Sequence, residues 1–580
     1  MPWNIPLFDS SGKIKDARLG PALTASGAVS LLELTSSSTA ALGQLRTASG
    51  TPALLGVTSN GTIVDDTLNS YVGVPDPTFS TSELVTLGYT AWVTEPRTRA
   101  APARPDPWTS NTTGFYYITN TGTNSGNGYP GDPAGPTGFP SNPPAGSLIV
   151  VEGHVERASS LGLTWTNGTE ANPIFLVGNT GRDTDRISFS GSNNMGITAD
   201  HMYMDGLTVN RRGATVGDGI FSLVGCDFVC IRNCTFDNLA GFRSGFGALT
   251  SINSTCTNIM FYRNNVGPGG DWDEGGQGDN DYHGIKAFGL NVWIMENYFF
   301  QNQGDGIQIN NEGGGAFPNE ARLYWVCGNT GTQNHQTMAW TKDAIDVVFS
   351  GNVSVDNFDG SNSAANAAFG CQGDYSHAWF INNKSELNGE GIKVAGSDGG
   401  NNVYIIGNEI KDQDPQNAAD SGGFNNWAIS VRNSGDQYIL FNTIHNCQAG
   451  IACVQGAGTP DDIKGNFIDD PTAASRQHIL VATSDANVDY NYYRGSSALT
   501  SGVTTGANDV ISTTPGMVDE ANDDFRPDTG SNMLDAIPDS AVATALDFFE
   551  TRYGFGIRED ILGTTRPQNT DHDFGAYEKI

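Results

Sequence analysis

The segment "WIMENYF", residues 293–299, contains the repeating unit from which most of this chain is built. Two mostly apolar residues, two variable residues, an Asn, one variable residue and often another apolar residue recur in "VCIRNCT", "FYRNNV", "YIIGNEI", "ILFNTI" and "DIKGNFI". The Asn of this unit occurs at Asn233, Asn264, Asn297, Asn329, Asn352, Asn383, Asn408, Asn442, Asn466 and Asn491. Successive Asn residues are 31, 33, 32, 23, 31, 25, 34, 24 and 25 positions apart. Repeats of roughly this length are typical of a solenoid.

Each repeat contains two or three short runs of alternating apolar and polar residues, and Gly, Asn or Asp separates the runs. Alternation with a period of two predicts β-strands, so each repeat is a coil of short strands rather than a pair of helices. Coils of this kind stack about 4.8 Å apart, and an Asn at equivalent turns can form a ladder of side-chain amides along the axis. We therefore interpret the Asn series as structural.

These repeats resemble the right-handed parallel β-helix of polysaccharide lyases, polysaccharide hydrolases and phage tailspikes. The resemblance implies an all-β fold, a single-stranded right-handed solenoid with three parallel sheets. The repeats predict that the β-helix covers residues 147–495.

The segments that flank the repeats have different sequences. Residues 1–93, with "IPLFDSSGKI" and many Thr, Ala, Gly and Leu residues, resemble the N-terminal segments by which phage tail fibres and tailspikes attach to the virion. Residues 94–146 hold ten of the 26 Pro, which predicts a linker and the entry to the first coil. Residues 496–580 include "GTTRPQNTDHDFGAYE", which looks like the closing segment of many bacterial β-helix proteins, and a helix is expected near 539–553. Such a region would cap the last coil, whose strand edges and core are otherwise exposed.

The composition limits the classes of partner. The chain has 580 residues, and its 30 basic and 63 acidic residues give a formal net charge of −33. This charge repels nucleic acids and anionic membranes, which excludes both as partners and leaves neutral glycans or a partner bridged by cations. No apolar run approaches the roughly 20 residues of a membrane-spanning helix. The first residues lack the basic start and apolar core of a signal peptide, so we expect a soluble chain.

The eight Cys residues are not spaced like those of a small disulfide-rich domain. A chain of this length buries a core without disulfides, so we expect free thiols and synthesis in a reducing compartment. Cys226, Cys230 and Cys234 are close together, but no His is interleaved with them. We therefore expect small core residues rather than a metal site.

A second motif, "NQGDGIQIN" at residues 302–310, recurs as "VGDGIFSL", "YHGIKAF", "KDAIDVV" and "NGEGIKV". The Ile and the residue two positions later should point inward, so the residue between them points out of the sheet. The expected outward residues are Phe221, Lys286, Gln308, Asp346, Lys393 and Ser430. The residues two positions before the Ile form a second row at the strand entries, namely Asp218, His283, Asp305, Asp343, Glu390 and Trp427. The expected inward stack is Ile220, Ile285, Ile307, Ile345, Ile392, Ile429 and Ile451.

The predicted catalytic residues are those of both rows between 283 and 346, namely His283, Lys286, Asp305, Asp343 and Asp346. Carboxylates on neighbouring coils cannot all stay ionised without cost, so one would act as a general acid and another as a base or nucleophile in a glycoside hydrolase. Alternatively, Lys286 or His283 would abstract a proton next to a uronate carboxylate, as in a lyase. Each Asp after a Gly can also simply complete a turn.

Substrate-binding residues are predicted on both sides of this cluster, and they are Gln308, Trp272, Glu390 and Lys393. Trp325, Trp340, Trp379 and Trp427 could also stack on sugar rings along a groove, with burial as the alternative. No cofactor is required. The Gly-rich loop 267–286 could still hold Ca²⁺ through the carboxylates of Asp271, Asp273, Asp279 and Asp281. Its spacing misses the EF-hand pattern, and a solvated acidic loop is the alternative interpretation.

Together these features predict a phage tailspike or tail fibre that binds and depolymerises a bacterial surface polysaccharide, as a glycosidase or a lyase. By resemblance to β-helix tailspikes, we expect a homotrimer that joins phage tail or baseplate proteins through its N-terminal region. It would assemble in the host cytoplasm, belong to the virion and act outside the cell. A non-catalytic receptor-binding fibre and a secreted bacterial polysaccharide lyase are the alternatives.

Overall fold

In the computed structural model the chain divides into two compact units, residues 1–73 and 74–580. Within residues 1–93 the structure describes only strands β1 (Leu45–Arg46), β2 (Pro52–Ala53), β3 (Gly56–Val57) and β4 (Ile63–Val64), which pair antiparallel as β1–β2 and β3–β4. The expected attachment region therefore lies almost wholly outside the described residues. The structure describes residues 94–579 except for 124–127, 213–218, 239–246, 271–281, 312–320, 358–366, 374–375, 396–401, 414–426, 433–434, 454–461, 470, 472–476, 483–485, 499, 515 and 554–555.

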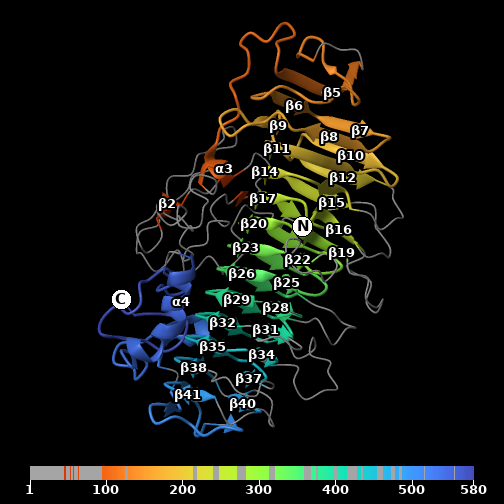
Figure 1. The fold of residues 1–580 in the computed structure, drawn as a ribbon. Helices are drawn as coiled ribbons and strands as arrows, with labels where there is room; N and C mark the ends of the chain where they lie inside the picture. The colour runs from red at the N-terminus through yellow and green to blue at the C-terminus, as the bar shows by residue number, and fades with distance from the viewer. Residues whose placement is uncertain are drawn as a thin grey trace, which may run out of the picture. The chain divides into compact units, whose positions relative to one another are not determined.

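The second unit contains three long parallel sheets, and the chain enters each of them once per coil (Figure 1). One coil consists of β19 (Tyr282–Ala287), β20 (Leu290–Met295) and β21 (Tyr298–Phe300). The next coil repeats this order with β22 (Ile307–Asn310), β23 (Arg322–Cys327) and β24 (Thr330–Thr332), and each of its strands pairs with its counterpart in register. The fold is a parallel β-helix, as the repeats predict.

We name the sheets A, B and C in the order in which each coil enters them, and β11 (Met195–Asp205) spans sheets A and B. The other strands of sheet A are β8 (Leu161–Trp165), β13 (Phe221–Leu223), β16 (Gly247–Ile252), β19, β22, β25 (Ala339–Lys342), β28 (Ala367–Gln372), β31 (Glu390–Ala395), β34 (Ile429–Arg432), β37 (Ile451–Cys453), β40 (Ile479–Val481) and β43 (Thr500–Ser501). The other strands of sheet B are β5 (Phe115–Thr123), β6 (Leu148–Glu152), β9 (Ile174–Gly178), β14 (Asp227–Arg232), β17 (Thr257–Tyr262), β20, β23, β26 (Ile345–Ser350), β29 (Ser376–Ile381), β32 (Val403–Ile406), β35 (Gln437–Leu440), β38 (Asp462–Lys464) and β41 (Asn487–Asp489).

Sheet C consists of β7 (His154–Arg157), β10 (Arg186–Ser190), β12 (Thr208–Arg212), β15 (Thr235–Asn238), β18 (Asn265–Val266), β21, β24, β27 (Val353–Val355), β30 (Lys384–Glu386), β33 (Glu409–Lys411), β36 (Thr443–His445), β39 (Phe467–Ile468), β42 (Tyr492–Arg494) and β44 (Val510–Ser512). The parallel strands thus run from β5 to β44, beyond the bounds of 147 and 495 expected from the repeats.

The core is an apolar interior lined by the inward side chains of all three sheets. On sheet A the register aligns Ile285, Ile307, Ala339, Phe369, Ile392, Ile429, Ile451 and Ile479 in one column, and all are fully buried. Five of the seven Ile residues expected in this stack are therefore confirmed. The other two are wrong for this column, because Phe221 rather than Ile220 aligns with it and Ile345 lies in sheet B.

The Asn series forms the predicted ladder at the turns between sheets B and C. From Asn264 to Asn466, each side-chain amide donates to the side-chain oxygen of the Asn in the next coil, at 2.9–3.0 Å, and Asn491 is the last acceptor. Asn233 is the exception: Cys234 occupies the ladder position in its coil, and its backbone amide donates to Asn264 Oδ1. A second, shorter ladder joins Asn302, Asn334, Asn357 and Asn388 at the turns between sheets C and A. The sequence motifs do not predict this second ladder.

All eight Cys residues are buried, and none forms a disulfide. This confirms the expectation of free thiols and of small core residues. Among the described residues, no helix is long and apolar enough to cross a membrane.

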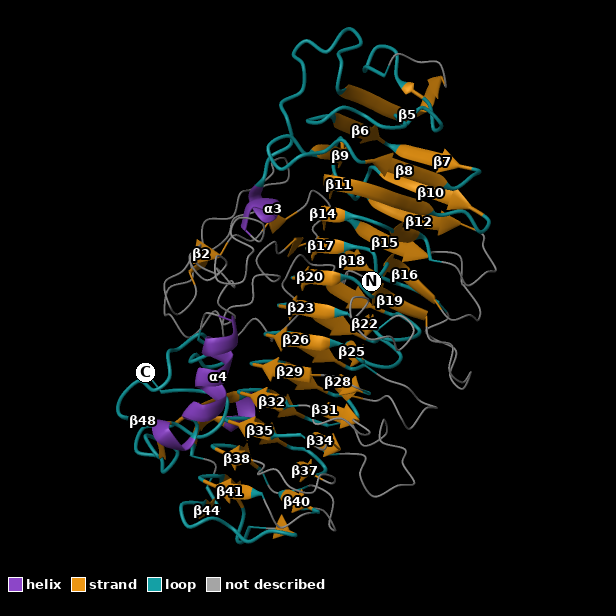
Figure 2. Cartoon of the chain, in the orientation of Figure 1, coloured by secondary structure: helices purple, strands orange, loops and turns teal. Residues whose placement is uncertain are grey.

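The C-terminal region folds back along the outside of the coils as well as following the last one (Figure 2). It contains β45 (Met517–Asp519), η3 (Glu520–Asn522), β46 (Asp524–Pro527), β47 (Ile537–Pro538), η4 (Asp539–Ala541), α4 (Ala543–Tyr553) and β48 (Asp571–His572). Helix α4 lies where the sequence predicts one. Its buried residues Phe549 and Tyr553 pack against Trp379 and Trp325 on the outward face of sheet B, with ring centroids 4.7 and 5.4 Å apart. Before the first coil, α3 (Thr94–Thr98) lies beside the same sheet, because Arg232 donates to the Arg99 carbonyl at 2.6 Å.

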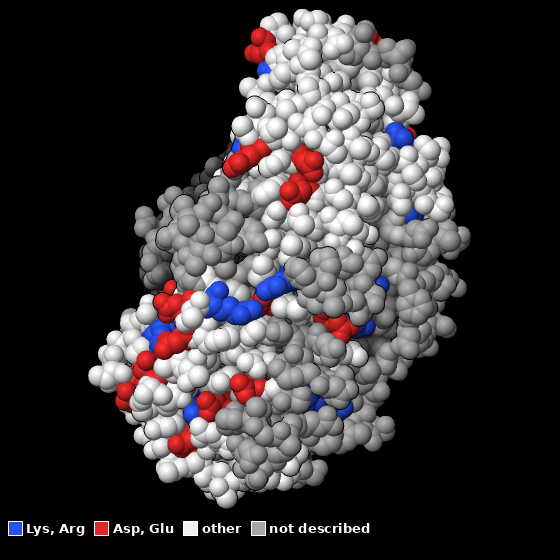
Figure 3. Space-filling model, in the orientation of Figure 1, with Lys and Arg blue, Asp and Glu red and all other residues white. Residues whose placement is uncertain are grey.

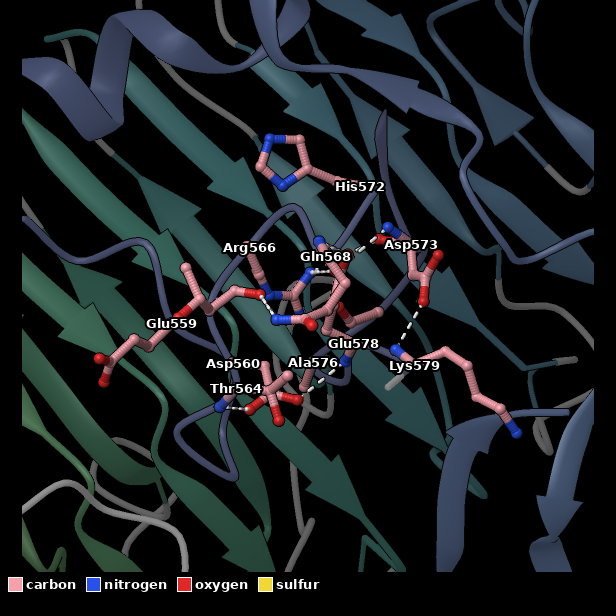
Figure 4. Close-up of polar contacts among 12 residues, drawn as sticks. Glu559, Asp560, Thr564, Arg566, Gln568, His572, Asp573, Ala576, Glu578 and Lys579 are labelled. Carbon is pink, nitrogen blue, oxygen red and sulfur yellow. Dashed lines mark hydrogen bonds and ion pairs between the residues drawn. The ribbon is translucent and has the colours of Figure 1, made fainter. Parts of the chain in front are cut away.

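Buried charges hold the last residues of the chain together (Figure 4). Arg566 donates to the Gly575 carbonyl at 2.8 Å and lies 3.5 Å from the Glu578 carboxylate. Asp560 accepts the backbone amides of Thr564 and Glu578 at 2.7 and 2.8 Å. Burial raises the pKa of Glu578 to about 7, against the opposing effect of Arg566. The segment around "DHDFGAYE" is thus fixed by its own ionic and backbone contacts.

Candidate functional site

The outward face of sheet A carries the candidate site. On consecutive strands from β19 to β34, the register aligns Lys286, Gln308, Trp340, Gly370, Lys393 and Ser430, which we call the outward row. Neighbouring strands lie about 4.8 Å apart, so the five steps of the row cover about 24 Å along the solenoid axis. The positions of Lys286, Gln308, Lys393 and Ser430 are as predicted, whereas Trp340 and Gly370 stand where the sequence analysis placed Asp346.

Asp305 lies at the entry to β22, and its carboxylate accepts three hydrogen bonds. Thr337, at the same place in the next coil, donates its hydroxyl and its backbone amide to Asp305 Oδ1, the amide at 3.2 Å. Gln308 of the outward row donates to Asp305 Oδ2 at 3.1 Å and in turn accepts a bond from Asn310 at 2.9 Å. Asp305 is 2% exposed. Its carboxylate therefore joins two coils and orients the outward row.

His283 lies at the same position one coil earlier, in direct contact with Asp305. Its Nδ1 accepts the Asp305 backbone amide at 3.0 Å and lies 3.3 Å from the Asp305 carboxylate. Burial acts to raise the pKa of Asp305, but His283 and the Thr337 hydroxyl outweigh burial and hold that pKa below its usual range. Asp305 is then ionised at neutral pH, which suits a base or an electrostatic partner better than a general acid.

Glu390 and Lys393 form an equivalent pair farther along the row. Lys393 Nζ lies 3.3 Å from Glu390 Oε2, and the Ser430 hydroxyl donates to the same oxygen at 3.4 Å. Glu390 and Lys393 are both buried. Glu390 and Lys393 are arranged like Asp305 and Gln308. In both pairs the acid lies at the entry to a strand of sheet A and its partner lies three residues later. The two predicted substrate-binding residues are thus an ion pair of the outward face.

Trp340 lies between these two pairs. A Cβ atom at Gly370 would come 2.1 Å from a carbon of the Trp340 ring, so the ring lies directly on the Gly370 backbone and requires a glycine there. Trp340 is 6% exposed.

The sequence motif did not place Thr337 and Trp340 in the coil next to that of Asp305, because residues 337–341, "TMAWT", lack the Gly-Asp-Gly-Ile signature. The spacing of 32 residues between Asn302 and Asn334 could have found them.

Asp343 and Asp346 do not align with Asp305 on sheet A, so the predicted alignment is wrong. Strand β25 aligns with β22 through Ala339 and Trp340, and Asp343 lies at the turn that follows, beside Gly373. Asp346 belongs to β26 in sheet B, where it accepts a bond from Arg552 at 2.6 Å and lies 3.5 Å from Arg322. Figure 3 shows basic and acidic side chains gathered where β26 lies beside the C-terminal region.

Other predicted members of the two rows are corrected or lie elsewhere. Phe221 is fully buried and aligned with Thr250 in the inward column, so it does not point outward. Trp427 packs with Ala449 and Ala452 in a small apolar cluster at the far end of the row. Asp218 lies outside the described residues.

The predicted calcium ligands Asp271, Asp273, Asp279 and Asp281, together with Trp272, also lie outside the described residues. Among the described residues, His445, Asp469 and Glu520 bring three ligand-type atoms within 4.8 Å of one another. Arg494 Nη1 lies 3.2 Å from Asp469 and also pairs with Glu520. The guanidinium already neutralises these carboxylates, so this group fits an ion-pair network between sheet C and the C-terminal region better than a metal site.

No protein-family model matches this sequence, and no curated protein matches it. Among solved structures, the pectate lyase Pel9A is 12% identical over 82% of this chain and 98% of its own, with a TM-score of 0.33. The PL6-family alginate lyase AlyGC is 12% identical over 63% of this chain and 51% of its own, with a TM-score of 0.41. The Dettilon tailspike protein is 14% identical over 64% of this chain and 63% of its own, with a TM-score of 0.37. Because all three TM-scores are below 0.5, the assignment of the fold rests on the strand register and not on these similarities.

Proposed function

We propose that this chain binds a polysaccharide along the outward row of sheet A and cleaves it there. The observation that carries the proposal is the register of the row, which sets amide, aromatic and cationic side chains on successive strands beside the carboxylates Asp305 and Glu390. A linear polymer parallel to the solenoid axis would contact the half-buried Lys286 and lie over the more deeply buried Gln308, Trp340 and Lys393. Sites of this type combine an aromatic surface with a few oriented polar groups.

The separation of the two carboxylates favours elimination over hydrolysis. Asp305 and Glu390 are three strand steps apart, about 14 Å. The paired carboxyl groups of glycoside hydrolases are at most about 9.5 Å apart. Within the two rows, as far as the structure describes them, these acids therefore do not act as one hydrolytic pair. Lys286, which pairs with Gln308 on the next strand and whose Nζ lies 5.5 Å from the centroid of the Phe288 ring, is the group that would abstract a proton next to a uronate carboxylate.

The biological setting that we propose is a tailspike or tail fibre of a bacteriophage, assembled as a homotrimer in the host cytoplasm and acting on a surface polysaccharide. The buried free thiols of all eight Cys residues agree with assembly in a reducing compartment. The resemblance of residues 1–93 to virion-attachment segments supports the same setting.

The test is incubation of the protein with a panel of bacterial capsular polysaccharides and lipopolysaccharides. Elimination produces new reducing ends together with the ultraviolet absorbance of an unsaturated uronate, whereas hydrolysis produces reducing ends alone. Light scattering should return three times the 61.4 kDa mass of one chain. A glycan that binds but releases no product would favour the non-catalytic fibre.

A further inference from the structure

One column at the turns from sheet A into sheet B contains only small residues in six consecutive coils. The residues that directly precede the paired positions of sheet B are Ala199, Cys226, Cys256, Gly289, Ala321 and Ala344. Backbone bonds confirm the stacking, because the Thr257 amide donates to the Cys226 carbonyl at 2.8 Å and the Leu290 amide to the Cys256 carbonyl at 3.0 Å. Ala or Gly satisfies the packing at this column in the other four coils. The two cysteines are therefore not required for size.

Cys226 and Cys256 occupy adjacent coils and contact each other. The Cys226 thiol donates to the Ile197 carbonyl at 3.2 Å, and both cysteine side chains are buried, at 1% and 0% exposure. The turns that precede the two cysteines are also hydrogen-bonded to each other, since the Gly225 amide donates to the Thr255 hydroxyl at 2.9 Å. Neighbouring parallel strands lie about 4.8 Å apart, which falls within the range of about 4.4–6.8 Å that disulfides span between Cα atoms.

We propose that Cys226 and Cys256 are a latent disulfide site, reduced during synthesis and closed by a disulfide oxidant after the protein leaves the reducing compartment. With oxidised glutathione, the Cys256 thiolate attacks one glutathione sulfur and releases one glutathione thiolate. The Cys226 sulfur then attacks Cys256, displaces the second glutathione and closes the bond. Two protein thiols are oxidised, one glutathione disulfide is reduced to two thiols, and the two thiol protons pass to the released glutathione.

The interaction between the two thiols supports Cys256 as the first nucleophile. The Cys226 side chain lowers the pKa of Cys256, against burial, and the Cys256 side chain raises the pKa of Cys226. A thiol with a lowered pKa supplies the thiolate that attacks a disulfide. The product would join one coil to the next through a loop of 30 residues, 256 minus 226. Closing such a loop restricts the unfolded chain and raises the melting temperature.

The experiment has two arms, because both thiols are buried. In one arm the native protein is incubated with oxidised glutathione. In the other it is unfolded in reductant and refolded in a glutathione redox buffer, so that the thiols meet the oxidant before the core closes. Thiols are then counted in denaturant after an acid quench. We expect eight minus two, that is six, in both arms, together with a mass lower by two hydrogen atoms and, under non-reducing conditions, a peptide that links residues 226 and 256.

The small-residue column provides matched controls. Cys226→Ala and Cys256→Ala place at these positions the residue that the same column already uses, so both variants should fold, yet neither should lose thiols on oxidation. Cys230→Ala, in β14, which begins directly after Cys226, removes another buried thiol and should still form the bond. The proposal is overturned if all eight thiols of the refolded protein react, or if the peptide map joins any other pair. A melting temperature that does not rise on oxidation would contradict the stabilising effect.

Discussion

The carboxylate of Asp346, in strand β26, accepts a 2.6 Å hydrogen bond from the guanidinium of Arg552, which lies 206 residues later in the last turn of α4. The Tyr553 hydroxyl donates to the same oxygen at 3.2 Å. A single buried carboxylate of the β-helix therefore holds the end of the C-terminal helix against sheet B. This contact gives Asp346 a structural role, so its burial in β26 requires no role in catalysis.

Replacement of this carboxylate should loosen the C-terminal region. Asp346→Asn keeps the shape and the tolerance for a positive φ, here 56°, but removes the charge that faces Arg552. We expect the free energy of unfolding in urea to fall by about 2 kcal/mol, because charge-assisted hydrogen bonds contribute roughly 1.5–3 kcal/mol. Asp547→Asn is the control, since its 2.7 Å pair with Arg558 is 61% exposed at the carboxylate and should change stability by less than about 0.5 kcal/mol. Equal losses in the two variants would argue against docking through Asp346.

Two substitutions, Ile307→Asp and Ile345→Asp, test the register of the core. Ile307→Asp places a carboxylate without a partner in the inward column of sheet A, and we expect a loss of at least about 4 kcal/mol or failure to fold. Ile345→Asp, at a half-buried position at the start of β26, should be clearly milder. Thermal melting of both variants measures the difference. Similar behaviour of the two would mean that Ile345 shares the inward column after all.

The contrast between Ile307 and Ile345 shows what the sequence could predict. The recurring Asn unit predicts the coils, because every coil must repeat the same turn, and the motif shared by "YHGIKAF" and "NQGDGIQIN" predicts the pairing of Ile285 with Ile307. "KDAIDVV" and "GDGIQIN" look alike because the turns into sheets A and B both favour a small polar residue before an apolar strand. The local pattern therefore does not show whether a segment enters sheet A or sheet B. The bond from Arg552 to Asp346 could not be predicted either, since no spacing relates two residues so far apart in the chain.

The Asn ladder should be sensitive at its centre. Asn352 is fully buried, donates to the Val326 carbonyl at 2.7 Å and to Asn383 at 2.9 Å, and accepts from Asn329 at 3.0 Å. Asn352→Ala leaves these partners buried and unsatisfied, so we expect a loss of about 2–5 kcal/mol in urea unfolding. Asn487→Ala removes a single exposed bond to Asp462 and serves as the control, with a change of less than about 1 kcal/mol. A loss at Asn352 no larger than the loss at Asn487 would mean that the ladder does not stabilise the stack.

The candidate site predicts different outcomes for the two acids that the sequence treats as equivalent. On a polysaccharide that the protein cleaves, Asp305→Asn should lower turnover by roughly 10²-fold or more, the usual cost of removing one oriented electrostatic group from a reaction site. Asp343→Asn, at the turn toward sheet B, should leave turnover within about twofold. Initial rates of product formation, with circular dichroism to establish folding, provide the comparison. Full activity in the folded Asp305 variant would place the chemistry elsewhere on the chain.

The ion-pair network around His445 predicts how stability depends on pH. Burial acts to lower the pKa of His445, but Asp469 and Glu520 outweigh it and raise that pKa above 6.5. Burial acts to raise the pKa of Asp469, but His445 and Arg494 outweigh it and hold that pKa below 3.8. A raised pKa of a base stabilises the fold below the pKa of the unfolded chain, and the effect is lost as pH rises through the folded value. A lowered pKa of an acid stabilises the fold above the unfolded value, and the effect is lost as pH falls.

The network should therefore stabilise the protein most between about pH 4 and 6.5, where both groups are charged in the folded and the unfolded chain alike. His445→Gln should lower the free energy of unfolding in that window, and its difference from the wild type should shrink as pH rises through the folded pKa of His445. Urea unfolding of the two proteins from pH 4 to 8.5 measures this difference. In Asp469→Asn the dependence attributable to His445 should weaken, because the nearest carboxylate, 3.0 Å from Nδ1, is gone. A difference between His445→Gln and the wild type that stays constant across this range would show that His445 acts through packing against Phe525, whose ring centroid is 5.0 Å away, rather than through its charge.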